Sequence, residues 1–423
     1  MRKPLVQAPG PELGQAPAEA PGGSAVEVAP ADLAGYLELG LERSPKLRAA
    51  FERWAGQVEQ ETVAVGLPNP RISWAEFVEE LETRAGPVQR RIGFVQGLPF
   101  PGVRAARGEV AEARSGLAWA EFERVRLELF GEVERAFSAY AYLGSKLDLV
   151  ERQLALLHEL EPIVQGRIQG GAAQSDLLQL QVEIGRLIND RASAEGALIA
   201  ASAELEAVVE WAGPRPLPPV QAAAAQRRAP LDREELLRIA LENAPRLREA
   251  GAQAELLNAE VALAVIGRWP GLELGLEWFD TDSALNPDTP DSGDDALALR
   301  LSFGLPVWVG RDAARVRSAR HGARAAEYAL EAAGAALGAE LELLAFQLED
   351  AARQITLYED ELLPRARAAR DLRIADYRGG AAALLDVIDA ERVELELLDG
   401  YARAVRDLSI ARTRLETLIG AEL

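Results

Sequence analysis

The sequence contains no cysteine, and its 423 residues include only two histidines, His158 and His321. The lack of cysteine excludes disulfides and thiolate metal sites, and it leaves the redox compartment undecided. Neither histidine has a second one close to it in the sequence, so a solvated or packed histidine is favoured over a metal ligand. We therefore expect no metal site.

Motifs of the common catalytic classes are also missing. The sequence has no P-loop, no G-x-S-x-G elbow and no dinucleotide-binding fingerprint. Its many carboxylates belong to segments that read as acidic helices, where such charges are usually solvated. We expect no catalytic residue and no cofactor, and we expect that the protein is not an enzyme.

Long apolar runs are absent as well. No stretch of 18 apolar residues occurs, so no transmembrane helix is predicted. The first 30 residues, MRKPLVQAPGPELGQAPAEAPGGSAVEVAP, carry two basic residues but no apolar core, and they do not form a complete signal peptide. Their Pro, Ala and Gly content predicts a flexible leader over residues 1–30.

Charge of one sign predominates. The chain has 67 Asp and Glu against 46 Lys and Arg, and the resulting net charge of −21 disfavours nucleic acid as a partner. Aromatic residues make up only 6% of the chain, whereas alanine and leucine are abundant, which favours long helices. Composition by itself would describe a soluble, acidic, mainly helical protein.

The chain carries an internal repeat. Residues 41–50, LERSPKLRAA, match residues 241–250, LENAPRLREA, at six of ten positions. Two more pairs follow in the same order, LPFPG at 98–102 with LPVWVG at 305–310, and RIQGGAAQSDLL at 167–178 with DYRGGAAALLDV at 376–387. The offsets of 200, 207 and 209 residues indicate a duplication.

The duplication sets the expected domain boundaries. The first repeat covers 31–212, the second covers 231–423, and a proline-rich linker at 213–230 separates them. Each repeat is expected to begin with one helix, over 31–65 and 231–267, and to continue with two strands and a long helical hairpin.

Each hairpin is predicted from a very long helical stretch, over about 103–168 and 310–378. At ~1.5 Å per residue each would span roughly 100 Å, a length typical of a coiled coil. A glycine pair ends each stretch and a return helix follows. We therefore predict helical hairpins at 103–212 and 310–421, whose tips are Gly170, Gly171, Gly379 and Gly380.

The candidate strands alternate between apolar and mostly polar residues. The pattern is clearest in GLELGLEWFD at 271–280 and ALALRLSFGL at 296–305. Their apolar faces consist of Leu272, Leu274, Leu276 and Trp278 in the first and Leu297, Leu299, Leu301 and Phe303 in the second. The first repeat has weaker counterparts, and the expected strands span about 70–82, 90–100, 271–281 and 295–306.

Two interpretations of these strands stay open at this point. A half-buried hairpin packed on helices would alternate in this way, and so would the strands of a transmembrane β-barrel. Four strands cannot close a barrel, so the second interpretation needs eight strands from two chains or twelve from three. Trp74, Trp269, Trp278 and Trp308 lie in or beside the strands, as an interfacial aromatic belt requires, although the other three tryptophans do not.

The duplicated plan, the LPFPG strand-to-helix junction and the Y-x-G-G…D-V-x-D tip resemble TolC-like outer-membrane efflux channels. Among these, the chain is most similar to the branch that serves heavy-metal and other cation pumps. The resemblance covers about 31–421. It implies a mainly α fold with a small β part, in which three chains form an α-helical tunnel joined to a shared 12-stranded β-barrel. The chain lacks the export signal and the lipid-anchor cysteine that many members carry, so we expect it to start downstream of the precursor's beginning.

The resemblance also implies a function. The homotrimer would be the passive exit duct of a tripartite efflux pump in the bacterial outer membrane, extending into the periplasm. Its partners would be a periplasmic adaptor, an inner-membrane transporter, of RND type by this reading, and outer-membrane lipid. Alternatives are a duct for type I protein secretion and a soluble coiled-coil scaffold or adaptor. The sequence leaves the substrate, heavy-metal cations or drugs, open.

The resemblance further assigns residues at the tunnel entrance. Tyr377 on the second hairpin matches a tyrosine that bonds an aspartate on the first, and Asp176 is the matching position. A reinforcing arginine of the family is replaced by Ala382. Asp386 and Asp389 lie three residues apart, on one helix face. They are either solvated charges near a helix start or, in a trimer, a ring of six carboxylates that attracts cations into the pore.

Overall fold

The computed structural model describes residues 28–171, 173–220, 232–286 and 288–421. Residues 1–27 of the expected leader and 221–230 of the expected linker lie outside the described residues. The described chain forms two compact units. The sheet unit consists of Phe51–Glu121 and Glu249–Ala332, and the helical unit consists of the described parts of Met1–Ala50, Phe122–Arg248 and Ala333–Leu423.

Each repeat opens with two helices, and the expectation of a single helix in each place was wrong. A proline ends the first helix because the residue before it is excluded from the α region. Ser44, before Pro45, has ψ 116°, and Ala244, before Pro245, has ψ 123°. The resulting pairs are α1 (Leu33–Arg43) with α2 (Pro45–Val65), and α5 (Arg233–Asn243) with α6 (Pro245–Ile266).

The long helices follow. The first hairpin consists of α3 (Val103–Gln169), which has 67 residues, and α4 (Gln174–Val208). The second consists of α7 (Val309–Leu357), the π-helical segment η1 (Tyr358–Leu362), α8 (Leu363–Arg378) and α9 (Leu384–Ile419). The helix expected over 310–378 is thus interrupted at η1. Within the described residues, no helix has a segment of the length and apolarity needed to cross a membrane.

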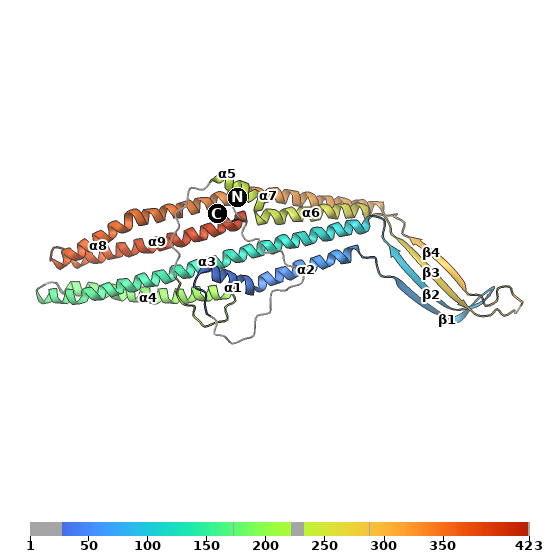
Figure 1. The fold of residues 1–423 in the computed structure, drawn as a ribbon, viewed down its shortest axis with the longest axis horizontal. Coiled ribbons are helices and arrows are strands. Elements are labelled where there is room, and N and C mark those ends of the chain that lie inside the picture. Colours follow the sequence, from blue (N-terminus) through green and yellow to red (C-terminus); the bar gives the residue numbers. More distant parts are fainter. Residues whose placement is uncertain (1–27, 172, 221–231, 287, 422–423) are drawn as a thin grey trace. The chain divides into compact units, whose positions relative to one another are not determined.

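The sheet has four antiparallel strands in the order β1-β2-β3-β4, which lie side by side in Figure 1. They are β1 (Arg71–Thr83), β2 (Gly86–Leu98), β3 (Leu272–Thr281) and β4 (Ala296–Phe303). The β2–β3 pairing joins the hairpin of the first repeat to that of the second, with Phe94 opposite Leu276. A mainly helical chain with a small sheet, as the sequence predicts, is confirmed.

The helical unit is held together by apolar clusters. One of these joins the two helical hairpins near their tips, and it consists of Val150, Leu154, Leu157, Leu160, Val164, Leu180, Ile184, Leu187, Tyr377, Leu384, Val387 and Ile388. The α3 members recur at three- and four-residue spacing, so they form one stripe along that helix. This packing brings the glycine-tipped ends of the hairpins together and positions the polar residues around them.

Candidate functional site

One face of the sheet is apolar and uncovered by the described chain. The eight residues predicted for it pair directly across β3 and β4, as Leu272–Phe303, Leu274–Leu301, Leu276–Leu299 and Trp278–Leu297. Leu299 is 81% exposed and Leu301 is 59% exposed. Six of the eight are exposed, and Leu272 and Trp278 are partly buried. Burying such side chains gains roughly 1.5–3 kcal/mol each, so this exposed set indicates an apolar surrounding.

The apolar face continues over the first repeat, where the sequence pattern was weaker. Ile92 lies opposite Trp278, and Phe94 lies opposite Leu276. In turn, Trp74 lies opposite Ile92, and Ile72 is 77% exposed opposite Phe94. Gln96, opposite Leu274, interrupts the face. All four strands therefore contribute to one apolar surface.

The opposite face of the sheet is polar. A side chain one position along a strand points to the other face, so Glu273, Glu277 and Arg300 lie on this second surface. Arg71 reaches Glu273 at 2.6 Å, and Arg300 lies 3.3 Å from Glu277. A sheet with one apolar and one ion-paired face is suited to separating hydrocarbon from water. In the described chain its outermost strands, β1 and β4, are each paired on one side.

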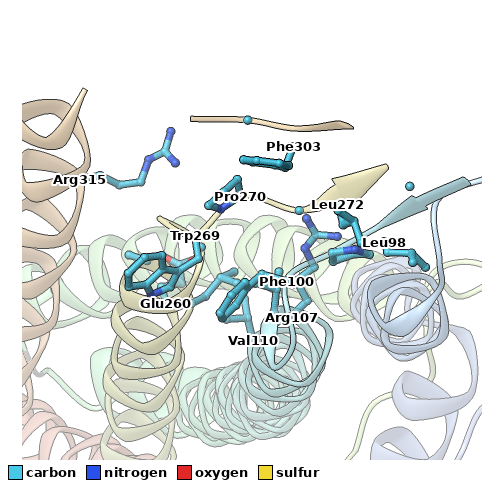
Figure 2. A pocket seen from close by; sticks show the side chains of 18 of the residues that line it. Leu98, Phe100, Arg107, Val110, Glu260, Trp269, Pro270, Leu272, Phe303 and Arg315 are labelled. Carbon is cyan, nitrogen blue, oxygen red and sulfur yellow. The ribbon is translucent and has the colours of Figure 1, made fainter. Parts of the chain in front are cut away.

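A groove of about 1210 Å³ lies where the sheet meets the helices of the sheet unit. Figure 2 shows the aromatic rings of Phe100 and Trp269 there, and their centroids are 5.9 Å apart. The Arg114 guanidinium pairs with Glu260 at 2.9 Å. The LPFPG segment, which the sequence singled out, supplies Leu98, Pro99 and Phe100 to the lining. The stacked rings and the ion pair connect the strands to the helices at this groove.

The hairpin tips lie at the predicted glycines. The second glycine of each pair has a positive φ, 102° at Gly171 and 84° at Gly380, which L-residues rarely adopt. At each, the backbone N–H donates to a carbonyl three residues back, to Ile168 and Tyr377 at 3.0 Å. These turns reverse the chain sharply and bring the start of each return helix beside the end of the outgoing one.

The predicted hydrogen bond between Tyr377 and Asp176 is not made. The ring of Tyr377 is fully buried, and its hydroxyl has no hydrogen-bond partner in the described part of the chain. Burial raises the pKa of Tyr377, and the Asp176 carboxylate raises it further, while Arg167 opposes both. Asp176 therefore acts on the phenol through its charge, without the bond that the resemblance implied.

Arg167 takes the place expected of Asp176, and sequence reasoning missed it. Its guanidinium carbon lies 4.2 Å from the centroid of the Tyr377 ring. Its Nη1 also donates a hydrogen bond of 2.8 Å to the Tyr377 carbonyl. Arg167 belongs to α3 and Tyr377 to α8, so this contact ties the first hairpin to the second. The sequence signal that could have identified Arg167 is its position, one helical turn before a glycine tip.

A second arginine, which belongs to the second hairpin, also connects the two hairpins. Arg392 of α9 donates two hydrogen bonds to Glu183 of α4, of 3.2 and 2.5 Å, and Glu183 is 5% exposed. The two ties run in opposite directions, since Arg167 reaches from the first hairpin and Arg392 from the second. We call these two contacts the arginine clamp.

The two predicted pore aspartates are both exposed, yet each has a partner. Asp386 accepts a hydrogen bond of 3.1 Å from the Ala383 N–H at the start of α9, which satisfies one of the unpaired amides there. Asp389 lies 3.6 Å from Arg392 and is 61% exposed. Arg392 is therefore shared between the clamp residue Glu183 and a candidate pore charge.

A buried carboxylate pair lies further along α9. Glu391 and Glu394 are 2% and 4% exposed, and both lie near Arg370 of α8, at 3.7 and 2.6 Å. Burial raises the pKa of Glu391 to about 7, and the Glu394 charge adds to the rise, while Arg370 opposes it. In the described residues no group of three or more His, Cys, Asp or Glu is arranged to hold a metal ion.

Residues 236–421 match the family model described as outer membrane efflux protein. This match covers most of the second repeat, over which the chain is similar to the family. The match confirms the resemblance noted in the sequence, the efflux role and the outer-membrane location extending into the periplasm. The family and the fold are those of transport channels.

Known proteins are similar over nearly the whole chain. The cobalt-zinc-cadmium resistance protein CzcC of Cupriavidus metallidurans is 24% identical over 414 residues, which cover 94% of each chain. The solved structure of CusC has a TM-score of 0.74 at 17% identity and covers 92% of each chain. The open outer membrane channel MtrE of Neisseria gonorrhoeae has a TM-score of 0.75 at 19% identity, covering 92% of this chain and 89% of that one. These likenesses show a shared fold.

Proposed function

We propose that three copies of this chain form one channel, the passive exit duct of a tripartite efflux pump. A periplasmic adaptor and an inner-membrane transporter, RND-type in this proposal, would deliver the substrate to its periplasmic end. The protein itself would catalyse no reaction. Efflux proteins of this family act in the outer membrane.

The observation that carries the assembly is the two-faced sheet, whose outer strands have no second partner strand within the described residues. An edge strand leaves backbone N–H and C=O groups without partners, and these groups cannot be left unpaired in hydrocarbon. Pairing β4 of one chain with β1 of the next would satisfy both edges. Three chains would contribute twelve strands, enclosing a lumen lined by the polar face that holds Arg71, Glu273, Glu277 and Arg300.

We further propose that the hairpin tips form the periplasmic entrance of the duct. The arginine clamp would hold the second hairpin against the first. Asp386 and Asp389, repeated by threefold symmetry, would place six carboxylates around the opening, and such a ring attracts cations. In this proposal the salt link from Arg392 to Asp389 offsets part of the ring's charge.

For the cargo, we propose divalent heavy-metal cations. The likeness to a cobalt-zinc-cadmium resistance protein over 94% of the chain supports this class, as does the net charge of −21. A bacterial strain deprived of its own outer-membrane metal channel should regain growth in cobalt, zinc or cadmium when this chain is supplied with its adaptor and transporter. Restored growth in antibiotic but not in metal would assign drugs as the cargo.

The assembly is tested by mass and by conductance. Purified in detergent, the protein should have the mass of three chains, and it should insert into planar bilayers as a cation-selective pore. A monomer that retains its full strand content in water without detergent would contradict the proposal, because the apolar sheet face would then be stable in water.

A further inference from the structure

The groove at the end of the sheet carries more positive than negative charge. Among the described residues, its charged lining consists of three arginines and two carboxylates, Arg107, Arg114, Arg315, Glu260 and Glu273. Both carboxylates are already paired, Glu260 with Arg114 at 2.9 Å and Glu273 with Arg71 at 2.6 Å. Two positive charges of the lining therefore have no carboxylate assigned to them.

These two charges belong to Arg107 of α3 and Arg315 of α7. Figure 2 shows Arg315 extending from α7 toward the strands. Both side chains are exposed, and neither guanidinium makes an ion pair or a hydrogen bond with the part of the chain that the structure describes. The planar fork of a guanidinium matches the oxygen atoms of a phosphate. Both arginines are therefore available to an anion that enters the groove.

The start of α7 adds further positive charge beside the groove. Residues 309–324 contain one carboxylate, Asp312, and five exposed arginines, Arg311, Arg315, Arg317, Arg320 and Arg324. The whole chain, in contrast, has a net charge of −21. A local excess of positive charge raises the concentration of anions near it. This end of α7 thus differs in sign from the rest of the molecule and favours an anionic partner.

The groove is also continuous with the apolar face of the sheet. Leu272 and Phe303, which lie opposite each other on β3 and β4, belong to that face and line the groove. Glu273 and Ser302 of the polar face line it too, since it lies at the ends of the strands. Trp269 is 48% exposed there, and an indole ring favours a boundary between hydrocarbon and water. A bound molecule can therefore place an anionic group near the helices and an apolar tail along the sheet.

We propose that the groove binds an anionic phospholipid, with its headgroup at Arg107 and Arg315 and an acyl chain against Leu272 and Phe303. A lipid without net charge has the same phosphate, but its ammonium group is repelled by the basic start of α7. The inference rests on the proposed function in one respect, because the apolar sheet face must lie in the membrane. It deepens that function by naming the class of lipid that the chain binds.

Native mass spectrometry of the protein in a non-ionic detergent, mixed with dioleoylphosphatidylglycerol, tests the site. The parent should bind this lipid. Arg107→Gln with Arg315→Gln should weaken binding roughly tenfold or more, because the charge-assisted hydrogen bonds to the phosphate are lost. Arg107→Lys with Arg315→Lys keeps both charges and should retain more affinity than the glutamine pair.

Arg317→Gln with Arg324→Gln is the matched control. Both arginines are exposed and belong to the basic start of α7, but neither lines the groove. This variant removes the same charge as the glutamine pair in the groove. It should lower the affinity by no more than about twofold, because a charge that does not contact the lipid is screened by salt. An equal loss in the two variants would overturn the groove as the binding site.

Two further probes distinguish a lipid from a free anion. Inorganic phosphate has the charge without the tail and should not displace phosphatidylglycerol at equal concentration. Dioleoylphosphatidylethanolamine has the same tails without net charge and should bind more weakly than phosphatidylglycerol. Displacement by phosphate, or equal binding of the two lipids, would overturn the proposal. Absence of bound phosphatidylglycerol from the parent would also overturn it and would leave a second copy of this chain as the occupant of the groove.

The lipid site and the proposed function can fail separately. Strand content by circular dichroism and the mass of the assembly are measured for every variant. If the glutamine pair does not assemble, the lysine pair and the lipid comparison on the parent decide the result. A parent that binds phosphatidylglycerol in the groove but has the mass of one chain and forms no pore would contradict the proposed function and leave the lipid site intact.

Discussion

The guanidinium of Arg167 lies over the ring of Tyr377, 4.2 Å from its centroid, and donates to the Tyr377 carbonyl at 2.8 Å. The phenol hydroxyl, in contrast, has no hydrogen-bond partner among the described residues. The face of the ring and the backbone of Tyr377 therefore tie the hairpins together. A tyrosine that locks through its hydroxyl, as the resemblance implied, would respond to mutation differently.

Removing the Arg167 guanidinium and the Tyr377 hydroxyl in separate variants should distinguish a contact made by the arginine from a lock made by the hydroxyl. Arg167→Ala should raise single-channel conductance and lower thermal stability, since a cation–π contact contributes about 0.5–2 kcal/mol and a hydrogen bond about 1 kcal/mol. Tyr377→Phe should leave both nearly unchanged, because it keeps the ring and removes an unsatisfied hydroxyl. Conductance in planar bilayers is the measurement, and a larger effect of Tyr377→Phe than of Arg167→Ala would restore the hydroxyl lock.

Substitutions on the two faces of the sheet should affect assembly in lipid differently. Leu299→Arg or Leu301→Arg should cost roughly 2–4 kcal/mol if these residues face the middle of the bilayer. Arg300→Lys should be tolerated, because Arg300 lies on the polar face beside Glu277. Assembly in lipid vesicles, followed by protease protection, measures the difference. Normal assembly of Leu301→Arg together with improved insertion of Arg300→Leu would reverse the two faces.

The entrance charges make a third prediction. Asp386→Asn with Asp389→Asn should weaken block by trivalent cations added from the periplasmic side, because the proposed ring loses its charge. Asparagine is the better choice at 386, since Asp386 caps α9 and alanine there would remove the hydrogen bond to Ala383. Arg392→Gln should have the opposite effect and tighten the block, because it frees Asp389. Equal blocker affinity in all three proteins would place both aspartates away from the pore.

Glu391 makes a prediction about pH. Its pKa is raised from 4.5 to about 7, so the folded protein holds this proton more tightly than the unfolded chain does. The corresponding stability is fully present below pH 4.5 and is lost as the pH rises toward 7. Glu391→Gln should flatten the fall in stability across this window, measured by denaturant unfolding at each pH. Glu396→Gln, at an exposed position on the same helix, is the control and should keep the parent slope.

Much of the architecture could be predicted from local sequence patterns. The three repeated segments indicated a duplication, and the glycine pairs marked both hairpin tips, because glycine adopts the positive φ that a sharp reversal after a helix requires. The alternation in 271–280 and 296–305 assigned the apolar residues of β3 and β4, because successive side chains of a strand point to opposite faces. Each of these signals depends on residues close together in the chain.

Contacts between distant segments could be identified only in the tertiary structure. Arg167 and Tyr377 are 210 positions apart, and Glu183 and Arg392 are 209 apart, so no local pattern pairs them. The sequence by itself determined the repeats, the turns and the two faces of the strands, because backbone sterics and side-chain periodicity are local. The tertiary structure decided which charges meet, because a side-chain partner depends on packing that brings remote helices together.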